Sequence, residues 1–78
     1  MLKNSDALVV LEEVAVSLKE SAEQIKSNSE FDGGRRMAYY EAISTLLSQC
    51  AVAGITPSEI GLEGFVPESI LGKEKQAA

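Results

Sequence analysis

The stretch RRMAYYEAISTLLSQCAVAGI, from Arg35 to Ile55, is the longest continuous helix-compatible apolar pattern in the chain. Two neighbouring rows of apolar residues run along it at helical spacing. One row is Tyr39, Ile43, Leu46, Cys50 and Ala53, and the other is Tyr40, Leu47 and Ala51. Together the rows cover an arc of about 160° at ~100° per residue, which is wide for a helix with one neighbour. The stretch therefore predicts a central helix that packs on more than one element.

A strip of small, nearly uncharged polar residues lies opposite these rows. It consists of Glu41, Ser44, Thr45, Ser48 and Gln49. Small side chains permit helices to approach closely. We therefore treat the strip as a candidate contact with a second chain.

A second amphipathic pattern precedes the central helix and predicts a helix over about residues 6–27. Its apolar seam, with 3,4,3,4,3 spacing, is Leu8, Leu11, Ala15, Leu18, Ala22 and Ile25. Val10 and Val14 widen this seam. The opposite face carries mixed charges and is expected to face solvent; its acidic residues include Glu12, Glu13, Glu20 and Glu23. Val9 and Val16 interrupt that face and mark a candidate small second contact.

Turn-forming residues, SNSEFDGG at 27–34, separate the two patterns and predict a helical hairpin. Either Ser29 or Asp32 can serve as the N-cap of the second arm, and we favour Ser29, with a helix over about 30–54. Gly33 and Gly34 would then lie in the first turns of the helix, where each glycine lowers helix stability relative to alanine. Glycines at such positions suggest that another backbone approaches the helix closely. Phe31 would be free to plug the end of the bundle.

The C-terminal third is too apolar to be a free tail. Gly54 and Ile55 have the pattern of a Schellman helix end. Thr56-Pro57-Ser58-Glu59 reads as a capping box that starts a short helix at about 57–61, and another turn is expected at about 67–71. We expect this segment to fold back over the hairpin, whereas residues 73–78 should fray.

These elements predict one domain over residues 1–78 with an all-α fold. The expected architecture is an antiparallel helical hairpin plus one or two short C-terminal helices, completing a four-helix bundle as a dimer. A chain of 78 residues buries only about 60–65% of the surface that its unfolded form exposes. A homodimer would supply the missing burial.

The composition excludes several function classes. The net charge is −5, which opposes binding to nucleic acid or to an anionic membrane. The single cysteine, Cys50, cannot form a disulfide within the chain, and the apolar run at 7–11 is too short for a signal peptide, so we expect a cytoplasmic protein. The chain contains no histidine. We therefore predict no catalytic site, no cofactor and no metal site.

Two groups of residues remain as candidate interaction sites. Arg35, Arg36, Tyr39 and Tyr40 form an RRxxYY cluster of residue types that are frequent in interface hot spots. Glu12, Glu13, Glu20 and Glu23 form an acidic surface suited to a partner with a basic surface.

These groups support two function hypotheses. The first is a non-catalytic protein–protein interaction module, namely a small acidic adaptor, inhibitor or immunity-type protein. The alternative is a regulatory subunit that binds a small anion through Arg35, Arg36 and Tyr39. The blocks FDGGRRMAYYEAISTL (31–46) and GITPSEIGL (54–62) resemble small bacterial or phage-encoded proteins, but this resemblance implies no functional residue.

Overall fold

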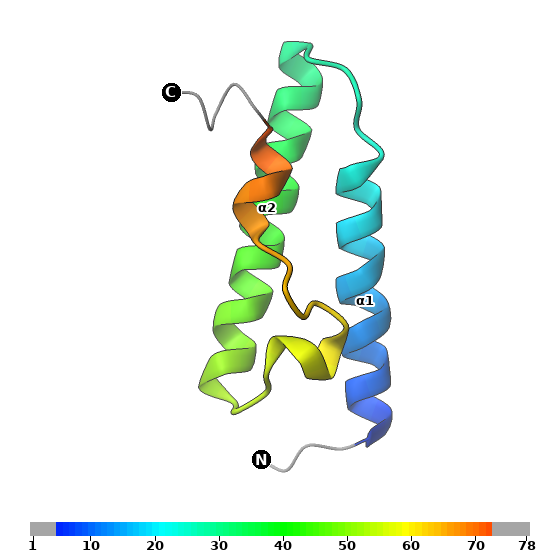
Figure 1. Cartoon of the computed structure of the whole chain (residues 1–78), viewed down its shortest axis with the longest axis vertical. Helices are drawn as coiled ribbons and strands as arrows, with labels where there is room; N and C mark the ends of the chain where they lie inside the picture. The colour runs from blue at the N-terminus through cyan, green and yellow to red at the C-terminus, as the bar shows by residue number, and fades with distance from the viewer. Residues whose placement is uncertain (1–4, 73–78) are drawn as a thin grey trace.

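The computed structural model describes residues 5–72, so the predicted fraying of 73–78 lies outside the described residues. The described chain is helical and contains no strand. Two long helices, α1 (Ser5–Glu23) and α2 (Glu30–Val52), form a hairpin, and two short 3-10 helices follow, η1 (Pro57–Ile60) and η2 (Pro67–Leu71). Figure 1 shows the C-terminal segment crossing one face of the hairpin. The all-α class and the hairpin are confirmed.

α1 buries the predicted seam but ends earlier than expected. Ala15 and Ala22 are buried in its centre, whereas the charged face is mostly exposed. The helix ends at Glu23, and the prediction of residue 27 was wrong. The last turn tightens, because the Gln24 N–H is shared between the Glu20 and Ser21 carbonyls and the Ile25 N–H bonds three residues back, to the Ala22 carbonyl at 3.2 Å. In the loop that follows, the Nη2 atom of Arg36 donates hydrogen bonds to the carbonyl oxygens of Ile25 and Ser27.

The start of α2 confirms Ser29 as the N-cap. The Ser29 hydroxyl oxygen accepts a hydrogen bond from the Asp32 backbone N–H at 3.1 Å. Two inferences drawn from this register were wrong. A Cβ built on Gly33 or Gly34 would meet nothing within 4 Å, so no close backbone approach requires these glycines. Phe31 is 76% exposed and does not plug the bundle, because it lies on the outer side of the first turn.

The end of α2 has the predicted Schellman geometry, although the helix stops at Val52 rather than at residue 54. Ile55 N–H donates to the Cys50 carbonyl at 2.8 Å, and Gly54 adopts a φ of 79°. Glu59 then accepts a hydrogen bond from the Thr56 backbone N–H at 2.8 Å, as expected for a capping box. The reversal after Gly54 directs the chain back along the hairpin.

The C-terminal segment completes the core, as predicted. η1 packs on α1 and η2 packs on α2. The main core cluster joins all four helices and the segment between η1 and η2 through Ala15, Ala22, Ile43, Cys50, Ile60, Leu62 and Ile70. Val16 is half-buried and lies against Gly61, so it does mark a second contact on α1. Within residues 5–72, no helix combines the length and the apolar character needed to cross a lipid bilayer.

The protein is elongated and exposes more surface than its mass requires. Its extents are 42 × 20 × 17 Å, and its accessible surface is 5370 Å². A compact monomer of this mass would expose about 4,600 Å². The large side chains that are fully buried are Ile43, Ile60 and Leu62. The C-terminal segment therefore covers one face of the hairpin and leaves apolar surface elsewhere.

Candidate functional site

A shallow groove lies between α1 and α2 and is not lined by the C-terminal segment. We call it the hairpin groove; its lining residues are Glu13, Val14, Ser17, Leu18, Ser21 and Tyr39, and its volume is about 300 Å³. Val14 remains 47% exposed, and Val10, one helical turn before it, is 60% exposed. Both valines were expected to widen the buried seam, but no element within residues 5–72 covers them. The hairpin groove is therefore the apolar face that the fold leaves open.

Three of the four predicted glutamates gather around a smaller hollow on α1. We call it the acidic hollow; Glu12, Glu13, Val16, Ser17 and Glu20 line it, and its volume is about 190 Å³. Glu23 is also exposed, but it lies outside this hollow, at the pocket described below. The structure therefore brings together Glu12, Glu13 and Glu20, and it separates Glu23 from them.

The two arginines of the predicted RRxxYY cluster lie in different surroundings. The Arg35 Nη1 atom pairs with Asp32 Oδ1 at 2.9 Å on the surface, and its guanidinium lies 5.9 Å from the centre of the Phe31 ring. Arg36 is half-buried and is bonded to the loop carbonyls of Ile25 and Ser27. Each arginine therefore already has a local partner, and the two do not share a ligand site.

The two tyrosines also contact different elements. Tyr39 lines the hairpin groove together with Val14 and Leu18. Tyr40 points to the C-terminal segment, where its hydroxyl donates to Glu68 Oε2 at 3.5 Å, a long hydrogen bond. Consecutive residues on a helix are about 100° apart, and this rotation places the two rings on different neighbours. Tyr39 alone therefore contributes to the open apolar face.

Electrostatic stabilisation is concentrated at the first turn of α2. Hydrogen bonding by Ser27 and then by Arg35 holds the pKa of the Asp32 carboxyl below its ordinary value. Asp32 also lies in the first turn of α2, where a carboxylate interacts favourably with the helix dipole. This arrangement fixes the helix start and does not form a reactive site.

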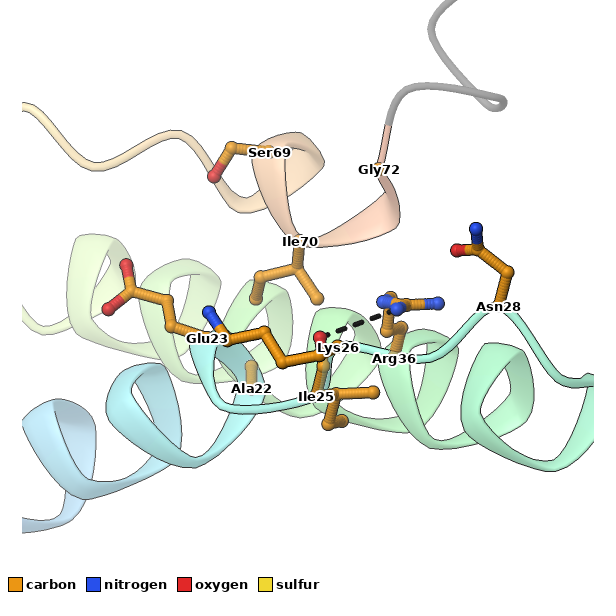
Figure 2. Close-up of a pocket in the computed structure, with 9 residues that line it drawn as sticks. All are labelled: Ala22, Glu23, Ile25, Lys26, Asn28, Arg36, Ser69, Ile70 and Gly72. Carbon is orange, nitrogen blue, oxygen red and sulfur yellow. Dashed lines mark hydrogen bonds between the residues drawn. The ribbon is translucent and has the colours of Figure 1, made fainter.

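A larger pocket lies where the end of α1 and the loop after it meet α2 and η2. We call it the loop pocket; it has a volume of about 650 Å³, and its lining residues are Ala22, Glu23, Ile25, Lys26, Asn28, Arg36, Ser69, Ile70 and Gly72. Figure 2 shows Arg36 beside the loop segment that carries Ile25, and Ile70 of η2 points toward this segment. Sequence reasoning missed Lys26, Asn28 and Ser69. No local sequence pattern could have predicted that these residues share a pocket, because Ser69 comes close to the loop only when the C-terminal segment folds back over the hairpin.

The polar strip of α2 is largely exposed in the single chain. Only Ser44 of its five residues is half-buried, and the other four are exposed: Glu41, Thr45, Ser48 and Gln49. The strip lacks an apolar centre, whereas the hairpin groove has one. The hairpin groove is therefore the stronger candidate for a second chain.

In residues 5–72, no group of three or more His, Cys, Asp or Glu side chains is placed to hold a metal ion. Cys50 is a free thiol that is buried in the core, as its position in the apolar row predicts. Comparisons with protein families, with curated proteins and with solved structures find no match to this chain. Its function must therefore be argued from its surfaces.

Proposed function

We propose that this chain is a non-catalytic protein–protein interaction module that works as a homodimer joined through the hairpin groove. The observation that carries this proposal is the exposed apolar face formed by Val10, Val14 and Tyr39, which the C-terminal segment does not reach. Contiguous exposed apolar surface on a small protein marks a contact site. A second copy is the occupant because it adds the burial that a chain of 78 residues lacks.

The dimensions of the molecule suit this contact. The whole chain measures 42 × 20 × 17 Å, and an interface along its broad side would be of the size of the roughly 800 Å² per partner that stable interfaces bury. In a two-fold dimer the same patch meets itself, so Val14 of one copy would pack near Val14 or Val10 of the other. Four long helices would then enclose a second apolar layer and form a four-helix bundle.

The acidic hollow provides the surface for a second partner. Glu12 and Glu20 line the hollow but not the hairpin groove, so dimerisation would leave them accessible. The net charge of −5 favours fast association with a protein that presents a basic surface. The dimer would display two such surfaces, as an adaptor, inhibitor or immunity-type protein requires.

The oligomeric state tests the proposal directly. Light scattering at micromolar concentration should give about twice the chain mass of 8.3 kDa. Val14→Glu should give the monomer mass with unchanged helicity, because the side chain is half-exposed in the single chain and its charge would be buried in the dimer. Val9→Glu is the matched control, since Val9 on the same helix is also exposed, at 57%, but does not line the hairpin groove.

Two results would contradict the dimer. One is a wild-type mass of 8.3 kDa at these concentrations. The other is dissociation by Val9→Glu to the same extent as by Val14→Glu, which would place the interface elsewhere.

A further inference from the structure

We infer that the loop pocket binds a small organic oxyanion, a carboxylate or a phosphate ester, through Arg36 and Lys26. This site differs from the hairpin groove and from the acidic hollow. It also differs from the RRxxYY cluster, because Arg35 and Tyr39 do not line it. The proposal thus goes beyond the dimer and does not depend on it.

Arg36 is pre-organised for an anion. Its Nη2 atom alone makes both hydrogen bonds to the loop, to the carbonyl oxygens of Ile25 and Ser27. Among the residues that the structure describes, Nε and Nη1 have no hydrogen-bond partner. Nε and Nη1 therefore keep N–H donors for an oxyanion, each as a single charge-assisted bond, because both paired faces of a guanidinium include Nη2, which the loop carbonyls occupy. The orientation of the guanidinium is already fixed, so binding would cost little side-chain entropy.

The charges around the pocket favour an anion although the whole chain is acidic. Two cations, Arg36 and Lys26, line it together with one carboxylate, Glu23. Within residues 5–72, neither cation forms a salt bridge. Two positive charges on the walls of one pocket attract a negatively charged ligand, although Figure 2 shows Lys26 extending toward Glu23 rather than toward Arg36.

The remaining walls suit an organic ligand better than a bare ion. Asn28 and Ser69 add an amide and a hydroxyl, while Ile25 and Ile70 are buried apolar residues of the floor. The volume of about 650 Å³ lies in the range of small-molecule sites. Since the lining comes from the loop, α2 and η2, a bound ligand would tie the C-terminal segment to the hairpin.

Titration with defined anions tests the inference. Amide chemical shifts of Asn28, Ser69 and Gly72 should move saturably with citrate or with a phosphate monoester, compared with chloride at equal ionic strength. The two anions are titrated separately, and the anion whose shifts saturate shows whether the pocket prefers a carboxylate or a phosphate. Saturation should be accompanied by a rise in Tm, because the ligand binds only the folded chain.

Three variants locate the site. Lys26→Gln should weaken binding about tenfold, as expected for the loss of one charge-assisted hydrogen bond. Ser69→Phe should abolish it by filling the pocket, and Ser69 is exposed, so folding should be preserved. Arg35→Gln is the matched control, because it removes a nearby positive charge outside the pocket. Val14→Glu should bind normally, which separates this site from the dimer contact.

Several outcomes would overturn the inference. Shifts that grow linearly without saturation would show ionic screening only. Binding that survives Ser69→Phe, or that Arg35→Gln weakens as much as Lys26→Gln, would place the anion outside the loop pocket.

Discussion

Asp32 connects several interactions at one residue. Its backbone N–H donates to the Ser29 cap, and its carboxylate accepts a hydrogen bond from Arg35 at 2.9 Å. These bonds fix the direction in which α2 leaves the loop. The loop in turn holds the carbonyls that Arg36 binds. Removing the charge of Asp32 therefore tests how much this residue contributes to the stability of the hairpin.

The lowered pKa of Asp32 predicts a pH-dependent contribution to stability. The folded-state pKa of Asp32 lies below its ordinary, unfolded-state value, so the contribution is present above the unfolded-state pKa and is lost as the pH falls through the folded-state pKa. Asp32→Asn should therefore lower Tm at neutral pH, and the difference from the wild type should vanish in strong acid. Thermal unfolding across this pH range measures it, and a difference that stays constant with pH would contradict the electrostatic cause.

At the scale of elements, the glycines of α2 predict a gain in stability. Gly33 and Gly34 are helical and exposed, and an added Cβ would meet nothing within 4 Å. Gly33→Ala and Gly34→Ala should each stabilise the protein by about 0.5–1 kcal/mol, because alanine loses less backbone entropy in a helix. Denaturant unfolding measures this difference. A loss of stability in either variant would show that an unseen partner approaches the helix there.

Gly61 gives the opposite expectation and serves as the control. Its φ is +78°, and an added Cβ would lie 3.0 Å from Cγ2 of Val16 on α1. Gly61→Ala should therefore destabilise the protein, both through backbone strain and by pushing η1 away from α1. Equal effects at Gly61 and at Gly33 would contradict this account.

Sequence reasoning predicted the elements whose ends are set by neighbouring residues. The Ser29 cap, the Gly54 helix end and the capping box at Thr56 each depend on contacts within a few positions. The end of α1 was not predictable in this way. The loop that follows it is held by Arg36, which lies eleven positions from Ile25 and belongs to the next helix.

The candidate sites were predictable only in part, for the same reason. The pattern identified the wide apolar arcs and the acidic face, but it could not show which part of an arc the C-terminal segment would cover. Val16 looked exposed and is packed, whereas Val10 looked buried and is exposed. The loop pocket needs Lys26 and Ser69 to meet, and only the tertiary fold brings them together.

At the scale of the whole molecule, shape and charge have separate roles. The elongated chain exposes 5370 Å² of surface, and its hairpin has one open apolar side, which favours a second copy. The excess of acidic residues would keep such a dimer soluble and would steer basic partners toward it. Apolar contact would thus set the assembly, and charge would select what the assembly binds.

A charge-matched pair of variants tests this division. Glu12→Lys with Glu20→Lys reverses two charges in the acidic hollow, whereas Glu41→Lys with Glu63→Lys makes the same change in net charge at exposed positions outside it. If the acidic hollow binds a basic protein, the tagged wild type and the Glu41→Lys/Glu63→Lys control should capture the same partner from a cell extract. The Glu12→Lys/Glu20→Lys variant should not capture it, because its lysines would repel the basic surface of the partner. Capture should weaken with added salt. Equal loss in both variants would mean that only net charge matters, and retention by the hollow variant would reject this surface.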